Sequence, residues 1–178
     1  MGRRTRLRVN ISTPDGRVPA GRGLAAWLEG IAPARARGEV TVALVSDRRM
    51  RVLNRAFRGK DYATDVLSFG VGSRESAVGS RKTPDPLSLG DIVIASGIAA
   101  RQAGEHGHAV GTELKVLSLH GLLHLIGYDH EARDDNGRMA RAEARLRAKA
   151  GLPTGLIARA KGGSPDSRLP TAGSRPRS

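Results

Sequence analysis

Three histidines, His120, His124 and His130, stand in the chain with the spacing H-x₃-H-x₅-H. Four residues advance an α-helix by roughly one turn, so the first two imidazoles project from the same face of a helix. Gly127 can adopt the left-handed conformation that ends a helix, which would let the chain fold back and bring His130 to the same point. Three imidazoles that leave one coordination position open are typical of a catalytic Zn²⁺ site. The spacing therefore predicts one zinc ion per chain.

The residue after the first histidine separates this motif from that of the metzincin proteases. Those proteases share the histidine spacing and the glycine, but carry at this position the Glu that acts as general base. This chain has Gly121 there, which has no side chain to accept a proton. A plainer interpretation is two buried histidines on an apolar helix followed by an unrelated one. The ligand spacing and the glycine at the bend favour a metal site without the peptidase base.

Three blocks of sequence resemble the YbeY family of bacterial rRNA maturation endoribonucleases. Residues 120–130 meet every fixed position of the pattern H-G-x-L-H-L-x-G-Y-D-H. Residues 54–69 resemble N-x-x-[YF]-R-G-K-D-x-x-T-D-V-L-S-F, and residues 89–94 resemble L-G-D-I-V-I. The blocks follow the order of the family, within a resemblance that covers roughly residues 5–152.

The resemblance implies a single-strand-specific, metal-dependent endoribonuclease. Such an enzyme acts in rRNA processing, at the 3′ end of 16S rRNA, and in ribosome quality control. The expected partners are rRNA and ribosomal particles, the small subunit above all, and neither DNA nor a membrane. The resemblance also implies that the arginine of the R-G-K-D block is essential, and this is Arg58 here. Arg58 and His120 are the predicted catalytic residues, with His120, His124 and His130 as the zinc ligands.

The chemistry of phosphodiester cleavage explains why an arginine is expected beside the metal. A Zn²⁺ on three histidines lowers the pKa of a bound water to about 7 and can polarise a phosphoryl oxygen. Negative charge gathers on the non-bridging oxygens, so a fixed cation is the second component. The planar guanidinium of Arg58 can grip two phosphate oxygens at once, which a lysine cannot do. Without the resemblance, Arg58 could equally be a surface charge paired with Asp61 or Asp65.

Other polar residues near the motif have alternative roles. Asp129 adjoins His130, and Asp91 follows a glycine at the start of a strand. Either carboxylate could orient a ligand imidazole by accepting its second N–H. Capping of backbone amides by Asp91 and an ion pair from Asp129 to an arginine are slightly favoured instead. His106 and His108 lie outside the ligand spacing, and we expect both to be solvent-facing loop residues.

The elements that must position these residues follow from hydrophobic periodicity. Strands are expected at residues 7–11, 39–45, 64–69 and 91–95, and helices at 24–31, 47–57, 98–103, 113–126 and 135–150. The helix at 113–126 is apolar on all sides and is therefore expected to be buried. Together with the resemblance, the pattern predicts one α+β domain over residues 1–155. A small mixed sheet of about four strands packs with about five helices, and the zinc site lies on the central buried helix.

Two segments are expected to lack regular structure. Residues 70–88 are rich in Gly, Ser and Pro and form a longer connection than is usual, which we expect to be mobile. Residues 156–178 are expected to form a basic, disordered tail. A solvated appendage without a role and an auxiliary RNA contact are equally good interpretations of this tail.

The composition limits the class of protein. A chain of 178 residues with no cysteine suits one domain without disulfides or thiolate metal sites. A net charge of +13 favours polyanionic partners, although an arginine-rich genome would give the same surface. The aromatic content of 3% disfavours a base-stacking platform. Because the start lacks an apolar signal region and no stretch approaches about 20 apolar residues, we expect a cytoplasmic protein.

Three functions remain compatible with the residues. The first is the endoribonuclease, the second is a zinc-dependent hydrolase of another substrate class, and the third is a non-catalytic ribosome-assembly factor with a structural zinc. Gly121 disfavours a peptide substrate, whereas a bound metal fits all three functions.

Overall fold

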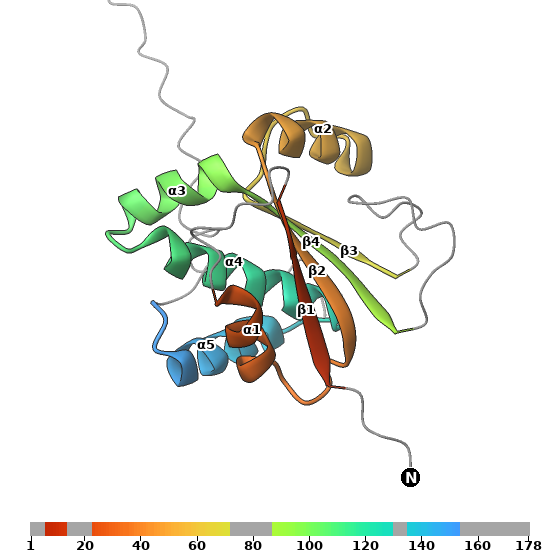
Figure 1. The fold of residues 1–178 in the computed structure, drawn as a ribbon, viewed down its shortest axis with the longest axis vertical. Helices are drawn as coiled ribbons and strands as arrows, with labels where there is room; N and C mark the ends of the chain where they lie inside the picture. The colour runs from red at the N-terminus through yellow and green to blue at the C-terminus, as the bar shows by residue number, and fades with distance from the viewer. Residues whose placement is uncertain (1–5, 14–22, 72–86, 130–134, 154–178) are drawn as a thin grey trace, which may run out of the picture.

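The computed structural model describes residues 6–13, 23–71, 87–129 and 135–153 (Figure 1). His130 lies outside these ranges, as do most of the connection expected at 70–88 and the tail expected at 156–178.

A mixed four-stranded sheet forms the centre of the described part. Its strands are β1 (Leu7–Ser12), β2 (Gly38–Val45), β3 (Val66–Gly70) and β4 (Ser88–Ala95), in the spatial order β1-β2-β4-β3. The strands β1, β2 and β4 run parallel, whereas β3 is antiparallel to β4 and forms one edge of the sheet. In this register Ile92 of β4 lies opposite Val42 of β2 and Ser68 of β3.

Five helices cover the two faces of the sheet in the part of the chain that the structure describes. They are α1 (Leu24–Ile31), α2 (Asp47–Arg58), α3 (Ser96–Glu105), α4 (Val110–Leu125) and α5 (Arg138–Ala150). One face packs against α1 and α4, with α5 beyond them, and the opposite face carries α2 (Figure 1). None of these described helices has the length and apolar character needed to cross a membrane.

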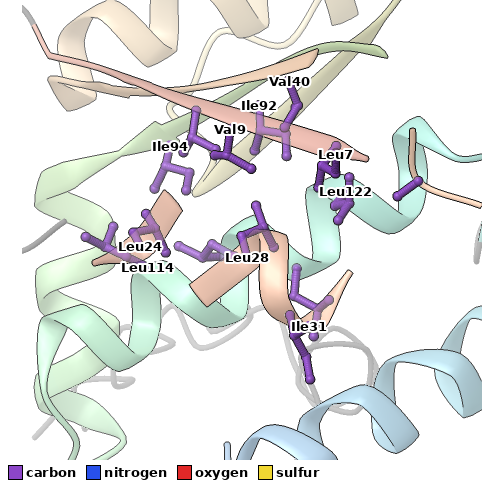
Figure 2. Packing of buried hydrophobic residues seen from close by; sticks show 14 of the residues in the cluster. Leu7, Val9, Leu24, Leu28, Ile31, Val40, Ile92, Ile94, Leu114 and Leu122 are labelled. Carbon is purple, nitrogen blue, oxygen red and sulfur yellow. The ribbon is translucent and has the colours of Figure 1, made fainter. Parts of the chain in front are cut away.

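The larger core lies between the sheet and the helices α1 and α4 (Figure 2). Leu28 and Leu122 have no exposed surface and belong to the same buried cluster as Ile92. Burial of each such side chain contributes about 1.5–3 kcal/mol to folding. A smaller core on the other face joins Met50 of α2 to Phe69 of β3. The helix α4 is thus held at the centre of the domain, as its uniformly apolar sequence predicts.

The predicted fold class is confirmed, and the predicted boundaries differ at several ends. β4 begins at Ser88 instead of residue 91, because Ser88 and Gly90 still pair with β2. α4 begins at Val110, three residues before the expected start. α5 begins at Arg138, because the carboxylate of Asp135 lies ahead of the helix and accepts the backbone N–H of Met139 at 3.2 Å.

Candidate metal centre

His120 and His124 lie one turn apart on α4 and face each other. Their Nε2 atoms are 3.2 Å apart, and their rings meet at 71° with centroids 4.8 Å apart. His120 is buried, and His124 is partly exposed at the end of the helix. Two ligands of a tetrahedral zinc with bonds of about 2.0–2.1 Å lie about 3.3 Å from each other. The two Nε2 atoms therefore fit a shared metal ion without rearrangement of the helix.

The chain turns back immediately after the second histidine. Gly127 has φ 85°, the left-handed conformation that the sequence predicts, and its N–H donates to the carbonyl of His124 at 3.0 Å. The ring of Tyr128 lies under the guanidinium of Arg35, 3.8 Å from the ring centroid, which fixes the turn against the segment before β2. The third predicted ligand, His130, lies outside the described residues.

Gly121 faces the sheet and not the space between the histidines. A Cβ at this position would lie 2.7 Å from Cγ2 of Ile92 and 3.0 Å from Oγ of Ser68. The hydroxyl of Ser68 donates to the Gly121 carbonyl at 3.2 Å. The helix thus approaches the sheet at the position where the metzincin motif carries its catalytic Glu. A glutamate side chain does not fit there.

A buried carboxylate from α5 contacts the first histidine. Oε2 of Glu143 lies 3.6 Å from Nδ1 of His120, and Oε1 accepts a hydrogen bond from Arg147. Glu143 and Arg147 are 1% and 2% exposed. Burial opposes ionisation of Glu143, but His120 and Arg147 outweigh it and hold the pKa of the carboxyl below its ordinary value. His120 therefore has its Nε2 toward His124 and its Nδ1 toward a carboxylate.

Arg58 is the last residue of α2 and is exposed to solvent. Gly59 ends the helix with φ 67° and donates its N–H to the carbonyl of Arg55 at 3.2 Å. The buried side chain of Asn54 then donates to the carbonyl of Tyr62 at 2.7 Å. Asn54, the first residue of the 54–69 block, thereby anchors the loop that follows Arg58 to the helix α2.

The two carboxylates considered as partners of Arg58 make other contacts. Asp61 accepts two hydrogen bonds from Arg51, at 3.0 and 2.8 Å, which hold the pKa of Asp61 below its ordinary value. Asp65 accepts the N–H of Val66 at 2.8 Å and the amide of Gln102 at 3.2 Å. Asp65 thus forms the local turn that opens β3 and ties this turn to α3.

The helices that carry Arg58 and the histidines pack on opposite faces of the sheet, and both contact the edge strand β3. Phe57, next to Arg58, packs edge-on against Phe69 with ring centroids 4.8 Å apart. Ser68, next to Phe69, bonds to Gly121, which adjoins His120. Because β3 is an edge strand of the sheet, only this strand separates the end of α2 from α4 along this path.

A second group of side chains could hold a metal ion where α3 leads into α4. One donor atom each from His106, His108 and Glu113 lies within 4.8 Å of the others. His108 Nε2 and the buried carboxylate of Glu113 are 2.5 Å apart, and His106 Nδ1 lies 2.6 Å from the carbonyl of Gln102. The prediction of two solvent-facing loop histidines is correct for His106 but wrong for His108, because the start of α4 at Val110 brings Glu113 beneath it.

The sequence did not predict every carboxylate near the histidines. Asp129 is exposed, and Asp91 lies within β4, so their suggested roles remain predictions. The contact from Glu143 was missed. One sequence feature could have indicated this contact. Glu143 stands four residues after Met139, within an apolar stripe that also includes Ala142 and Leu146 and packs on the core. A charge in an apolar stripe is unusual and calls for a buried partner.

Comparisons with known proteins agree with the motifs. Residues 23–151 match the family described as Endoribonuclease YbeY. A protein of that name from Solibacter usitatus is 51% identical over 116 residues, which cover 65% of this chain and 69% of that protein. Another from Anaeromyxobacter sp. is 46% identical over 149 residues, which cover 82% of this chain and 72% of that protein. A solution structure of a Thermotoga maritima protein is 24% identical, with a TM-score of 0.48, and covers 91% of this chain and 99% of that one.

The matched range includes Arg58, His120, His124 and His130, together with Glu143. The resemblance inferred from the three sequence blocks is confirmed, and the chain belongs to the YbeY endoribonuclease family.

Proposed function

We propose that the protein is a single-strand-specific, zinc-dependent endoribonuclease. Its role is rRNA processing, including maturation of the 3′ end of 16S rRNA, and ribosome quality control. Membership in the family and relatives that are named endoribonuclease support the activity. The observation that carries the metal dependence is the 3.2 Å separation of the His120 and His124 Nε2 atoms. The role implies a cytoplasmic protein whose partners are rRNA and ribosomal particles, the small subunit above all.

One Zn²⁺ is held in this proposal by His120, His124 and His130. Gly127 has the left-handed conformation just after α4 ends, and in this proposal the chain that follows it returns His130 to the first two ligands. When bound there, zinc supplies an activated water near neutral pH and polarises a phosphoryl oxygen. The histidines hold the ion and leave one position open, while Glu143 lies behind His120 on the side away from His124.

The group at the start of α4 is a weaker candidate for the catalytic ion. The 2.5 Å contact between His108 and Glu113 has the length of a direct hydrogen bond. It is shorter than the gap of about 3.3 Å between two ligands of one tetrahedral zinc. A metal ion would have to separate these two atoms, whereas His120 and His124 already have the required spacing.

The helix α2 provides the cationic surface that an RNA substrate requires. It presents five exposed arginines, Arg48, Arg49, Arg51, Arg55 and Arg58. Contacts of such residues with phosphates supply affinity that does not depend on sequence. Arg58 ends this row beside the edge strand β3, and in the proposal its guanidinium holds the non-bridging oxygens of the scissile phosphate. Binding through phosphates and shape agrees with the low aromatic content.

Elemental analysis of protein prepared without added metal tests the zinc site. Wild type and His106→Ala should each contain about one equivalent of zinc, and His124→Ala should contain none. His106→Ala is the matched control, because it removes an imidazole from the other candidate group. Zinc retained by His124→Ala and lost from His106→Ala would assign the metal to that other group.

Cleavage assays on the same preparations separate the three candidate functions. The zinc-loaded wild type should cleave a labelled single-stranded rRNA precursor fragment, and should leave the same fragment intact when it is annealed to its complement. A casein-like peptide should remain uncut, because the position at which metzincin proteases carry their general-base Glu is Gly121 here, and a glutamate does not fit there. Cleavage of the peptide alone would support a different zinc hydrolase. Zinc-loaded protein that binds ribosomal particles without cutting RNA would support an assembly factor.

A further inference from the structure

Glu143 is held in one orientation by a buried arginine. Arg147 donates to Oε1 of Glu143, and its other terminal nitrogen donates to the carbonyl of Pro153 at 3.0 Å. This arrangement leaves Oε2 directed at Nδ1 of His120, 3.6 Å away. The carboxylate is 1% exposed, so little water competes for Oε2.

We propose that Glu143 is a positioning residue for the metal. It keeps the proton of the His120 imidazole on Nδ1, and thereby directs the Nε2 lone pair at the ion, while Arg147 holds Glu143 in place for this task. The inference rests on the zinc site proposed above. It adds a residue from the helix α5 to a site whose motif residues are His120 and His124 of α4, His130 and Arg58 at the end of α2.

The chemistry of imidazole explains the effect. A neutral imidazole carries one N–H and one lone pair, and the hydrogen bond at one nitrogen selects which nitrogen is free to bind a metal. A distance of 3.6 Å is longer than a hydrogen bond, so the proposal requires the imidazole and the carboxylate to come closer by a few tenths of an ångström. Carboxylates placed behind a ligand histidine in this way typically change metal affinity by about 10–100-fold.

A purely structural role is the competing explanation. Glu143 and Arg147 are four residues apart on one helix. In this explanation, the sole role of the pair is that each residue neutralises the buried charge of the other. A structural pair would affect the stability of α5 but would leave the zinc affinity and the tautomer of His120 unchanged. Both quantities can be measured, so the two explanations are separable.

Zinc affinity provides the first test, with Asp135→Asn as the matched control. Asp135 is likewise a buried carboxylate that contacts α5, but it accepts the backbone N–H of Met139 at 3.2 Å. Competition with a chromophoric chelator should show that Glu143→Gln binds zinc about 10–100-fold more weakly than wild type. Asp135→Asn should bind zinc as wild type does. A folded Glu143→Gln with wild-type zinc affinity would overturn the proposal.

The tautomer of His120 provides a second test that needs no variant at Glu143. Long-range ¹H–¹⁵N correlation spectra of the zinc-free wild type, recorded where the ring is neutral, should place the proton on Nδ1. Spectra of His120→Gln, in which the signals of this ring are absent, give the assignment. A proton on Nε2 would overturn the proposal even if Glu143→Gln does not fold.

The tests distinguish failure of this inference from failure of the zinc site. Wild type that binds no zinc, or His124→Ala that keeps it, would remove the zinc site. Wild type that needs His124 for zinc but has the proton of His120 on Nε2 would remove only the role of Glu143.

Discussion

The hydroxyl of Ser68, on the edge strand, donates to the backbone carbonyl of Gly121, in the helix that carries the histidines, at 3.2 Å. This bond joins two of the three sequence blocks, because Ser68 belongs to the block at 54–69 and Gly121 to the motif at 120–130. It requires the helix backbone to approach the strand closely, which a side chain at position 121 would prevent. The glycine that removes a peptidase base is thus also the residue that seats the metal-binding helix on the sheet.

Replacing Gly121 by alanine should destabilise the protein despite the higher helix propensity of alanine. The gain in propensity is about 1 kcal/mol. Against it stands the added methyl group, 2.7 Å from the β-branched side chain of Ile92, which has no exposed surface. Overpacking of this kind costs about 1–3 kcal/mol. Denaturant unfolding of the zinc-free protein should therefore show a net loss of up to about 2 kcal/mol.

Gly30→Ala is the matched control for this change. Gly30 lies within the helix α1 with no atom near its missing Cβ, so alanine should stabilise the protein by as much as about 1 kcal/mol. Equal stabilisation of Gly121→Ala and Gly30→Ala would show that the approach of α4 to the sheet tolerates a side chain.

The sequence was sufficient for those features that depend on local periodicity. The spacing of His120 and His124 alone places both rings on one face of a helix, and the structure has their Nε2 atoms 3.2 Å apart. The left-handed conformation of Gly127 was likewise expected, since it follows from the need to end a helix. The expected four strands and five helices are all present in the described residues.

Features that depend on packing between helices could not be predicted. Glu143 lies beside His120 only because α5 packs against α4. No local sequence pattern determines how these two helices pack against each other. The contact between His108 and Glu113 was missed for another reason. The helix begins three residues earlier than its apolar pattern suggests, and this places Glu113 inside its first turn, below the preceding loop.

Removal of the His108 imidazole should destabilise the protein. Its Nε2 contacts the carboxylate of Glu113, which has no exposed surface, and the loss of a buried hydrogen-bond partner costs about 1–3 kcal/mol. Thermal and denaturant unfolding of His108→Ala should show this loss. His106→Ala is the control, because His106 is exposed and should contribute little. Equal stability of the two variants would show that Glu113 does not depend on His108.

Binding to rRNA should weaken steeply as the salt concentration rises. Each contact between an arginine and a phosphate releases condensed counterions, so the logarithm of affinity falls linearly with the logarithm of salt concentration. Removal of one phosphate-binding arginine of α2, as in Arg55→Ala, should reduce the slope by about 1. Fluorescence anisotropy with a labelled fragment over a salt series measures both slopes. Binding that does not respond to salt would argue against α2 as the RNA surface.

Arg58 should be needed for cleavage but not for zinc. It is exposed at the end of α2, so Arg58→Ala should leave the zinc content and the unfolding free energy nearly unchanged. If its guanidinium stabilises the negative charge that develops on the scissile phosphate, the single-turnover cleavage rate of Arg58→Ala should be about 10²–10³-fold lower than that of wild type. Arg58→Lys should restore little of this rate, because a point charge on a flexible stem cannot reproduce the two-pronged contact.

Arg55→Ala separates this specific role of Arg58 from general attraction of RNA. Arg55 is an exposed arginine on the same helix, one turn before Arg58. Its removal should weaken RNA binding at low substrate concentration and leave the cleavage rate at saturation near that of wild type. A cleavage rate in Arg58→Ala that equals the rate of Arg55→Ala at saturation would remove Arg58 from the reaction. The edge strand β3 would then separate two independent sites, a phosphate-binding helix on one face and the histidines on the other.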